Sequence, residues 1–321
     1  MSSNIPKVLV SHPRFPESGL KLLQSKFEVT VCEGVEREEI VRKSKGVEGI
    51  LWVNCELLNA EILDSAGPQL KAIVTGTAGF DYVDLAEIEK RGIQFGYTPN
   101  VPNDAVADLA IGLMIAAGRR FNEGFQKIVE QKWQLNDPLW MLGQDIKGST
   151  VGIVGFGRIG QVIARRLKGF DVARIIYSGN SEKEEGRELG ANLVSFKPLL
   201  RESDFVFIAC PLTNETRNLF DKAAFEEMKE TSVLINIARG GIVVQTDLIE
   251  ALRTGKIFAA GLDVMDPEPL TENHPLTKLS NCVLTPHLGS AATRTRNNMS
   301  LLSAKNLING IEGKPMLYPH Y

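Results

Sequence analysis

The chain has 321 residues, of which 43% are hydrophobic and 23% charged, and this globular balance excludes a disordered or collagen-like protein. At ~100 to 200 residues per domain, the length predicts two domains with a large buried core. The net charge of -3 at pH 7 gives no field that would attract nucleic acid or an anionic membrane, so neither partner is expected.

The cysteines and the chain ends predict neither a metal site nor a membrane anchor. Four cysteines lie far apart, without a CxxC pair or a nearby histidine, and are expected to be reduced, packed thiols: Cys32, Cys55, Cys210 and Cys282. The N-terminus lacks a basic region followed by a long apolar stretch, and the apolar run 109–117 is too short to span a bilayer. The ending 319–321 matches no peroxisomal or lipidation motif, so a cytoplasmic location is expected.

The first hundred residues alternate short apolar runs with amphipathic stretches. This rhythm predicts a mostly parallel sheet with helices, its strands at 8–10, 29–31, 50–53 and 72–74. Helix formers fill 104–117, after the breaker-rich run 98–102, and Asn103 or Asp104 is the expected cap. A crossing between two domains is therefore expected near residue 102.

A second α/β series begins at Ser149, after a polar helix and a loop-like apolar cluster around Trp140 that is expected to form an interface. Six strand patterns follow: STVGIVG, VARIIYS, DFVFIAC, SVLINIA, FAAGLDV and CVLTPH. They make a complete doubly wound unit. The residues after Pro286 turn helical through Ile308 without a strand of their own, so we expect them to pack on the first unit. The expected fold is α/β with two Rossmann-like doubly wound domains, the first discontinuous: 1–101 with 288–321, and 102–287.

Residues 155–160 read GFGRIG, a GxGxxG pattern between an apolar strand and a helix. Gly155 permits a tight turn, Gly157 lets the backbone approach a phosphate, and Gly160 permits close packing of the helix on the strand. The N-terminus of the helix offers free N–H groups to a pyrophosphate. The pattern favours a dinucleotide cofactor over a glycine-rich turn without a ligand.

The tip of the second strand of this unit bears on the choice of cofactor. An acidic residue there would bind the ribose 2′-hydroxyl of NAD. The tip instead reads Ser178-Gly179-Asn180, whose small polar groups would not repel a 2′-phosphate. NADP is therefore favoured, and NAD stays possible because no arginine occupies the tip.

Three later strands end in reactive side chains, namely Arg239, Glu268 and His287. Because ligands bind beyond the carboxyl ends of parallel strands, these residues are expected to meet near the phosphate site. Arginine can hold a carboxylate in a bidentate manner, histidine can exchange a proton near neutral pH, and a glutamate beside it can orient the ring and favour its charged form. Taken singly, His287 could be a structural histidine, Glu268 a loop carboxylate and Arg239 a helix cap or surface charge. Together, the three side chains suggest hydride and proton transfer to a 2-oxo acid.

Four motifs resemble the D-isomer-specific 2-hydroxyacid dehydrogenase family in order and spacing: GFGRIG at 155–160, NIARGGIV at 236–243, GLDVMDPEP at 261–269 and TPHLGS at 285–290. Within it, Pro138-Leu139-Trp140 and the stretch 274–300 most resemble glyoxylate reductase/hydroxypyruvate reductase. The resemblance implies NADPH-dependent reduction of 2-oxo acids, glyoxylate to glycolate and hydroxypyruvate to D-glycerate. It also implies that 1–101 with 288–321 bind substrate and that 102–287 bind NAD(P).

The resemblance further implies roles for individual residues. His287 would be the acid/base, Glu268 its partner and Arg239 the substrate clamp. The backbone at Ala78 and Gly79 would bind the substrate carboxylate, consistent with accessible N–H groups at Gly76 and Gly79. The cofactor-lining residues would be Gly155, Gly157, Arg158, Ile159, Gly160, Ser178, Asn180, Pro211, Ile237 and Asp263, the last of which could instead only cap a turn.

A homodimer is implied as well, formed by the helix 104–117 and the loop around Trp140. In relatives, a loop of this kind enters the partner's site and selects substrate, although Trp140 could also be a plain interface anchor. Two alternatives to the whole reading stay open: an NAD-dependent D-2-hydroxyacid dehydrogenase of another specificity, and a cofactor-sensing interaction protein like the co-repressors that share this fold.

Overall fold

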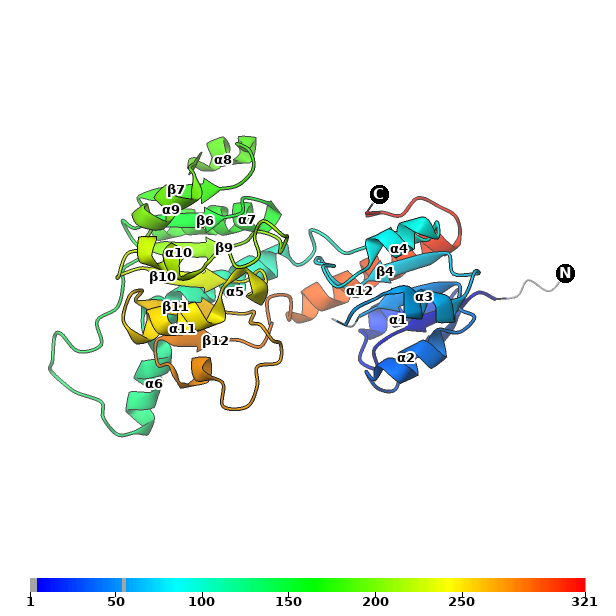
Figure 1. The fold of residues 1–321 in the computed structure, drawn as a ribbon, viewed down its shortest axis with the longest axis horizontal. Helices are drawn as coiled ribbons and strands as arrows, with labels where there is room; N and C mark the ends of the chain where they lie inside the picture. Colours follow the sequence, from blue (N-terminus) through cyan, green and yellow to red (C-terminus); the bar gives the residue numbers. More distant parts are fainter. Residues whose placement is uncertain (1–4, 54–55, 321) are drawn as a thin grey trace. The chain divides into compact units, whose positions relative to one another are not determined.

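The computed structural model describes residues 5–53 and 56–320 (Figure 1). The chain divides into two compact units, each built on a parallel sheet. Unit 1 runs to Pro102 and resumes at Ala292, whereas unit 2 is continuous from Asn103 to Ala291. The predicted α/β fold, with two Rossmann-like units of which the first is discontinuous, is confirmed.

Unit 1 contains a five-stranded sheet in the order β2-β1-β3-β4-β5, with every described pair parallel. Its strands are β1 (Lys7–Val10), β2 (Glu28–Val31), β3 (Gly49–Trp52), β4 (Ala72–Thr75) and β5 (Gln94–Gly96). Its helices are α1 (Glu17–Gln24), α2 (Arg37–Ser44), α3 (Ala60–Ala66), α4 (Leu85–Lys90) and α12 (Thr293–Ile311). The sequence reading missed β5, because three residues are too few to show an alternating pattern.

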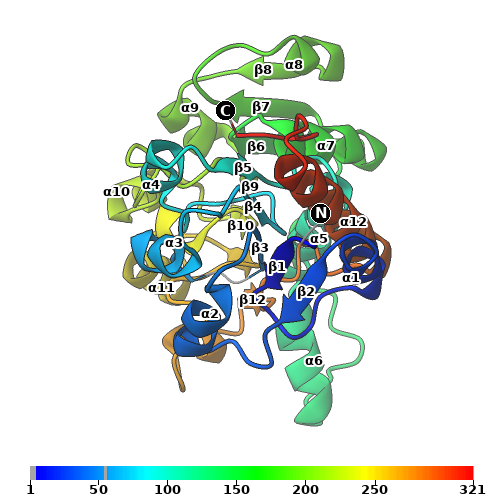
Figure 2. The ribbon, with the colours of Figure 1, turned by 90° about the vertical axis from the view of Figure 1, so that its right-hand side faces the viewer.

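The C-terminal helix α12 belongs to unit 1, where it packs beside α1 (Figure 2). Ala304, Leu307, Ile308 and Ile311 are buried in one cluster with residues of β1, β3 and β4. Their spacing of three and four residues places them on one face of the helix, which explains why this segment needs the sheet of unit 1. Burying each large aliphatic side chain contributes about 1.5–3 kcal/mol.

Unit 2 contains a seven-stranded sheet in the order β12-β11-β10-β9-β6-β7-β8, with parallel pairing throughout the described register. Its strands are β6 (Thr150–Val154), β7 (Arg174–Ser178), β8 (Ala191–Leu193), β9 (Phe205–Ile208), β10 (Val233–Asn236), β11 (Ala259–Leu262) and β12 (Cys282–Leu284). Its α-helices are α5 (Asn103–Gly118), α6 (Phe121–Val129), α7 (Arg158–Leu167), α8 (Glu184–Leu189), α9 (Phe196–Glu202), α10 (Lys222–Glu227) and α11 (Gln245–Arg253), and its short 3-10 helices are η1 (Lys168–Phe170), η2 (Gly240–Ile242) and η3 (Pro275–Lys278). Six of the strands were predicted; β8 was missed, since two of its three residues are exposed.

Helix α5 lies largely inside unit 2, where Ala107, Ala110 and Met114 are fully buried. It packs against α7 and the strands β10 and β11. The apolar side chains of α5, which were expected to form part of a dimer surface, therefore pack largely in the core of unit 2. Helix α6 differs, since none of its residues is buried and Phe121 and Phe125 are 57% and 63% exposed.

The second boundary between the units lies at 291/292, four residues beyond the expected 287/288. The N–H groups of Leu288 and Gly289 donate to the Asp263 carboxylate, which ties this stretch to unit 2. Cys32, Cys210 and Cys282 are buried free thiols, and burial raises the pKa of each; Cys55 lies outside the described residues. No helix in the described parts of the chain is long and apolar enough to cross a membrane.

Candidate active site

The GxGxxG segment forms the expected turn between β6 and α7. Gly155 has φ of 92°, and a Cβ there would come within 2.5 Å of the Cys210 nitrogen, so this position requires glycine. Gly160 contacts the Gly155 carbonyl so closely that a Cβ would collide with it. These contacts hold the first turn of α7 against the sheet.

Gly157 is the N-cap of α7 and makes no side-chain capping bond. A Cβ at Gly157 would meet nothing within 4 Å, so its surroundings are open. Arg158 and Ile159 begin the helix, and the N–H groups of its first turn have no intrahelical acceptors. An open, uncapped helix N-terminus after a buried strand fits the pyrophosphate of a dinucleotide.

The tip of β7 lies next to the glycine turn, because the Gly155 N–H donates to the Ser178 carbonyl at 2.9 Å. Ser178 is buried, Asn180 is exposed, and a Cβ at Gly179 would meet nothing within 4 Å. Nearby, Arg187 donates to Glu182 at 2.5 and 3.1 Å, which lowers the pKa of that carboxyl. The tip itself carries no acidic side chain.

Two further expected cofactor-lining residues follow neighbouring strands of the sheet. Pro211 is exposed and lies three residues beyond β9, whereas Ile237 is buried directly after β10. β9 pairs with both β6 and β10, so these positions share the sheet edge with the glycine turn.

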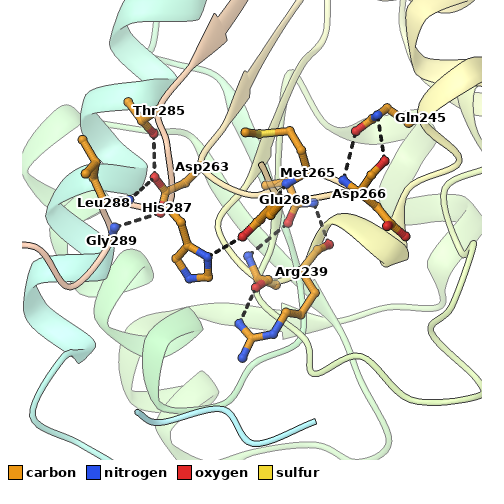
Figure 3. Close-up of polar contacts among 12 residues, drawn as sticks. Arg239, Gln245, Asp263, Met265, Asp266, Glu268, Thr285, His287, Leu288 and Gly289 are labelled. Carbon is orange, nitrogen blue, oxygen red and sulfur yellow. Dashed lines mark hydrogen bonds and ion pairs between the residues drawn. The ribbon is translucent and has the colours of Figure 1, made fainter. Parts of the chain in front are cut away.

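Arg239, Glu268 and His287 follow three adjacent strands, because β11 pairs with β10 on one side and β12 on the other. His287 Nδ1 lies 2.8 Å from Glu268 Oε2, and the other oxygen, Oε1, accepts from the Met265 N–H at 2.8 Å (Figure 3). The structure thus brings the histidine and the glutamate into the pairing that the sequence predicts.

The Glu268 carboxyl stays ionised in this setting. Burial alone would raise its pKa, but hydrogen bonds from His287 and the Met265 N–H, with the charges of His287 and Arg239, outweigh burial and lower the pKa. An ionised carboxylate can only accept, so Nδ1 carries the shared proton. The other ring nitrogen, Nε2, has no hydrogen-bond partner among the described residues, which leaves it available to a ligand.

The backbone holds His287 in an uncommon conformation, with φ of 53°. A left-handed residue other than glycine costs about 1–3 kcal/mol, so its surroundings must offset that cost. The His287 N–H donates to the carbonyls of Asp263 and Thr285 at 2.9 and 3.0 Å. The buried Asp263 carboxylate accepts from the Thr285 hydroxyl at 2.6 Å. It also accepts from the N–H groups of Leu288 and Gly289, the two residues after the histidine (Figure 3).

Arg239 is fixed by the residues on either side of it. The buried side chain of Asn236 donates to the Arg239 carbonyl at 2.9 Å and accepts from the Ala238 N–H at 3.0 Å. Gly240 lies directly against the Met265 carbonyl, where any side chain would collide. The loop that carries Arg239 therefore packs on the loop that carries Glu268.

Ala78 and Gly79 lie in unit 1, in the loop between β4 and α4. The expectation that Gly76 leaves its N–H accessible is wrong, because this N–H donates to the Trp52 carbonyl at 3.0 Å. The Thr77 hydroxyl donates to the Gly79 carbonyl at 2.7 Å and shapes the turn. The N–H groups of Ala78 and Gly79 find no acceptor among the described residues.

Trp140 lies in unit 2 and lines a pocket of about 550 Å³ together with Phe125, Ile128 and other residues of α6. The structure therefore groups Trp140 with the exposed apolar helix. The main-chain N–H of Trp140 donates to the Asp137 carbonyl at 3.2 Å, within the same loop.

Comparison with known proteins identifies the family to which this chain belongs. Residues 111–289 match the model of the D-isomer specific 2-hydroxyacid dehydrogenase, NAD binding domain. A glyoxylate reductase/hydroxypyruvate reductase of Homo sapiens is 49% identical over 285 residues, covering 88% of this chain and 87% of that one. The chain belongs to the D-isomer-specific 2-hydroxyacid dehydrogenase family.

Two further similarities extend over nearly the whole chain. A glyoxylate reductase of Pyrococcus horikoshii is 42% identical and covers 94% of this chain and 92% of its own. The crystal structure of an NADPH-dependent glyoxylate/hydroxypyruvate reductase of Sinorhizobium meliloti, in complex with NADP and malonate, superposes with a TM-score of 0.87 at 30% identity, covering 98% and 97%. The predicted family is confirmed, and with it an oxidoreductase that acts on CH–OH groups with a nicotinamide cofactor.

Sequence reasoning missed some of the residues that hold the site in place. Asp263 was expected to line the cofactor or only to cap a turn, and its carboxylate accepts three hydrogen bonds from the His287 loop, as a turn cap does. Asn236 was passed over, although a buried asparagine at the last position of a strand signals bonding to local backbone. Nothing in the sequence indicated Gln245, whose carboxamide bonds to Asp266, 21 positions away.

Proposed function

We propose that this protein reduces glyoxylate to glycolate and hydroxypyruvate to D-glycerate, with NADPH as the preferred cofactor. The observation that carries the proposal is the His287–Glu268 pair at 2.8 Å, at the ends of neighbouring strands on the sheet that carries the glycine turn. The names of the human, Pyrococcus and Sinorhizobium relatives support the substrates.

In the proposed mechanism, Glu268 holds His287 through Nδ1, so that the protonated ring presents an N–H at Nε2. That N–H first hydrogen-bonds to the keto oxygen and then transfers its proton to it. The nicotinamide, when bound, supplies the hydride that adds to the keto carbon. One hydride and one proton convert the 2-oxo acid to the 2-hydroxy acid, and Nε2 is left able to accept a proton in the reverse direction.

The substrate carboxylate is assigned to Arg239, whose guanidinium can bind it in a bidentate manner and draw electron density from the adjacent carbonyl. On the family resemblance, the N–H groups of Ala78 and Gly79 are further donors to this carboxylate. Trp140 is assigned to the selection of substrate.

The cofactor is assigned to the uncapped turn at Gly155, Gly157, Arg158, Ile159 and Gly160, which would hold the pyrophosphate. Ser178 and Asn180 would accommodate the 2′-phosphate, because no carboxylate at the tip of β7 opposes it. Pro211 and Ile237 follow β9 and β10, where they would line the nicotinamide side.

A homodimer in the cytoplasm completes the proposal. The exposed apolar side chains of α6 support it, since Phe121, Phe125 and Ile128 line one pocket with Trp140 and large exposed apolar surfaces are rare on monomers. In a two-fold dimer each copy would cover the patch of the other.

The test is turnover. Purified protein is mixed with glyoxylate, hydroxypyruvate or pyruvate, each with NADPH and with NADH, and the loss of nicotinamide absorbance is followed. Rapid loss with NADPH and hydroxypyruvate is expected. A preference for NADH would overturn the cofactor assignment, and no turnover with any pair would move the assignment to a cofactor-sensing interaction protein.

A further inference from the structure

The residues between Asp263 and Glu268 form a loop that leaves β11 and carries the partner of His287. Asp266 and Glu268 are exposed on this loop, so packing against a core does not hold them. Hydrogen bonds must therefore hold the Glu268 carboxylate in place beside His287.

Gln245, the first residue of α11, contacts this loop from outside (Figure 3). Its Nε2 donates to the Asp266 carbonyl at 2.9 Å, and its Oε1 accepts from the Asp266 N–H at 3.2 Å. One carboxamide thus satisfies both backbone groups of a single residue, as a neighbouring strand would. The two bonds also fix which end of the carboxamide is the donor.

His274 contacts the same carboxamide from the other side, since its Nε2 lies 3.1 Å from Gln245 Nε2. The tautomer sets the roles at this contact, because His274 Nδ1 also lies 3.3 Å from the Leu276 nitrogen and a neutral ring accepts at only one of its two nitrogens. Gln245 and His274 are both half-buried, which protects these bonds from competing water.

The bonds continue from Asp266 to the reacting pair. The preceding residue, Met265, donates its N–H to Glu268 Oε1, and Glu268 Oε2 holds His287 Nδ1. The Met265 carbonyl also packs directly on Gly240, next to Arg239. A shift of Asp266 would therefore move both the carboxylate that orients His287 and the support of the arginine.

We infer that Gln245 is a positioning residue for the proposed acid/base, acting on His287 through the backbone of Asp266 and the carboxylate of Glu268. The inference rests on the proposed function and assigns no contact between Gln245 and substrate or cofactor.

The test compares Gln245→Met, which keeps the length of the side chain and removes both bonds to Asp266, with Thr246→Val, an exposed neighbour on the same helix. Because small misplacements of a catalytic group cost up to ~10²-fold, kcat of Gln245→Met should fall about 10- to 100-fold. The Kd of NADPH, measured by fluorescence, should not change. Gln245→Glu keeps the acceptor for the Asp266 N–H but sets a carboxylate oxygen against the Asp266 carbonyl, so it should not recover the loss.

A double-mutant cycle separates positioning from general destabilisation. If Gln245 acts through Glu268, Gln245→Met should cost less than about 3-fold in a Glu268→Gln background. An equal loss in both backgrounds, or no loss in the single variant, would overturn the inference.

A readout that needs no turnover keeps the inference separate from the proposed function. The Nδ1 proton shared by His287 and Glu268 should give a downfield proton resonance, identified by its absence in His287→Asn. Gln245→Met should broaden or shift this resonance, whereas Thr246→Val should not. A resonance unchanged in Gln245→Met would overturn the positioning role, whereas an inactive wild type with a sensitive resonance would overturn only the function.

Discussion

The main-chain N–H of His287 donates to the main-chain carbonyl of Asp263 at 2.9 Å, while the Asp263 carboxylate receives the N–H groups of the two residues after the histidine. Asp263 is 1% exposed, so these bonds form away from water. A buried carboxylate at the end of one strand thereby determines where the next strand presents its histidine.

Asp263→Asn tests this relationship. The substituted amide can no longer accept at both positions, and it turns a donor toward an N–H group. Bonds to charged acceptors contribute about 1.5–3 kcal/mol each, so the melting temperature should fall by several degrees and kcat by roughly 10-fold or more. Asp247→Asn, which weakens a single bond from the Lys222 N–H, is the control and should change kcat little. Equal kcat values in the two variants would contradict the role of Asp263.

His287→Asn tests the proton transfer. Removal of a general acid lowers kcat by roughly 10² to 10⁴, and the cofactor should bind as in the wild type because the glycine turn is untouched. Initial rates and NADPH fluorescence provide the two measurements. His12→Asn in unit 1 is the control, and turnover that survives in His287→Asn would remove the histidine from the mechanism.

The pH profile tests the Glu268 pair. Its lowered pKa means that the folded protein keeps this carboxyl ionised to a lower pH than the unfolded chain does. The pair therefore stabilises the fold above about pH 4.3, and this contribution fades as pH falls.

The pH dependence of the rates tests the proton transfer. Reduction needs a protonated His287 ring, so its rate should decline as pH rises, whereas the rate of oxidation should increase. Flat profiles in both directions would count against His287 as the proton carrier.

Much of this site follows from one rule of parallel sheets and the residues at three strand ends. Arg239, Glu268 and His287 could be predicted because their strands carry clear apolar patterns and the residues come just after them. Gln245 could not, because nothing in local spacing tells that a helix start will face a loop 21 positions away. The burial of α5 was also missed, since an apolar helix looks the same in sequence whether its own unit or a partner covers it.

Gly179→Asp tests the cofactor preference. A side chain at Gly179 has open space, so the substitution places a carboxylate at the tip of β7 without a clash. Repulsion of the 2′-phosphate should raise the KM for NADPH by about 10-fold or more and leave that for NADH nearly unchanged. Gly179→Asn has the same shape without the charge and serves as control. If both variants behave alike, charge at this tip does not select the cofactor.

Phe125→Glu tests the dimer. Phe125 is 63% exposed and α6 buries none of its residues, so the change should leave the fold of unit 2 intact. A charge in an apolar contact should shift sedimentation toward the mass of a single chain. Lys127→Glu on the same helix is the control for charge alone. A wild type that already sediments as one chain would contradict the proposed dimer.

In the proposed function, the His287–Glu268 pair serves the reduction of small 2-oxo acids by NADPH. The most direct measurement is the initial rate of nicotinamide oxidation with hydroxypyruvate, for the wild type and His287→Asn at equal concentration. We predict fast turnover with NADPH in the wild type and a loss of roughly 10² to 10⁴ in the variant. Equal rates in the two proteins, or no turnover in either, would contradict this function of the pair.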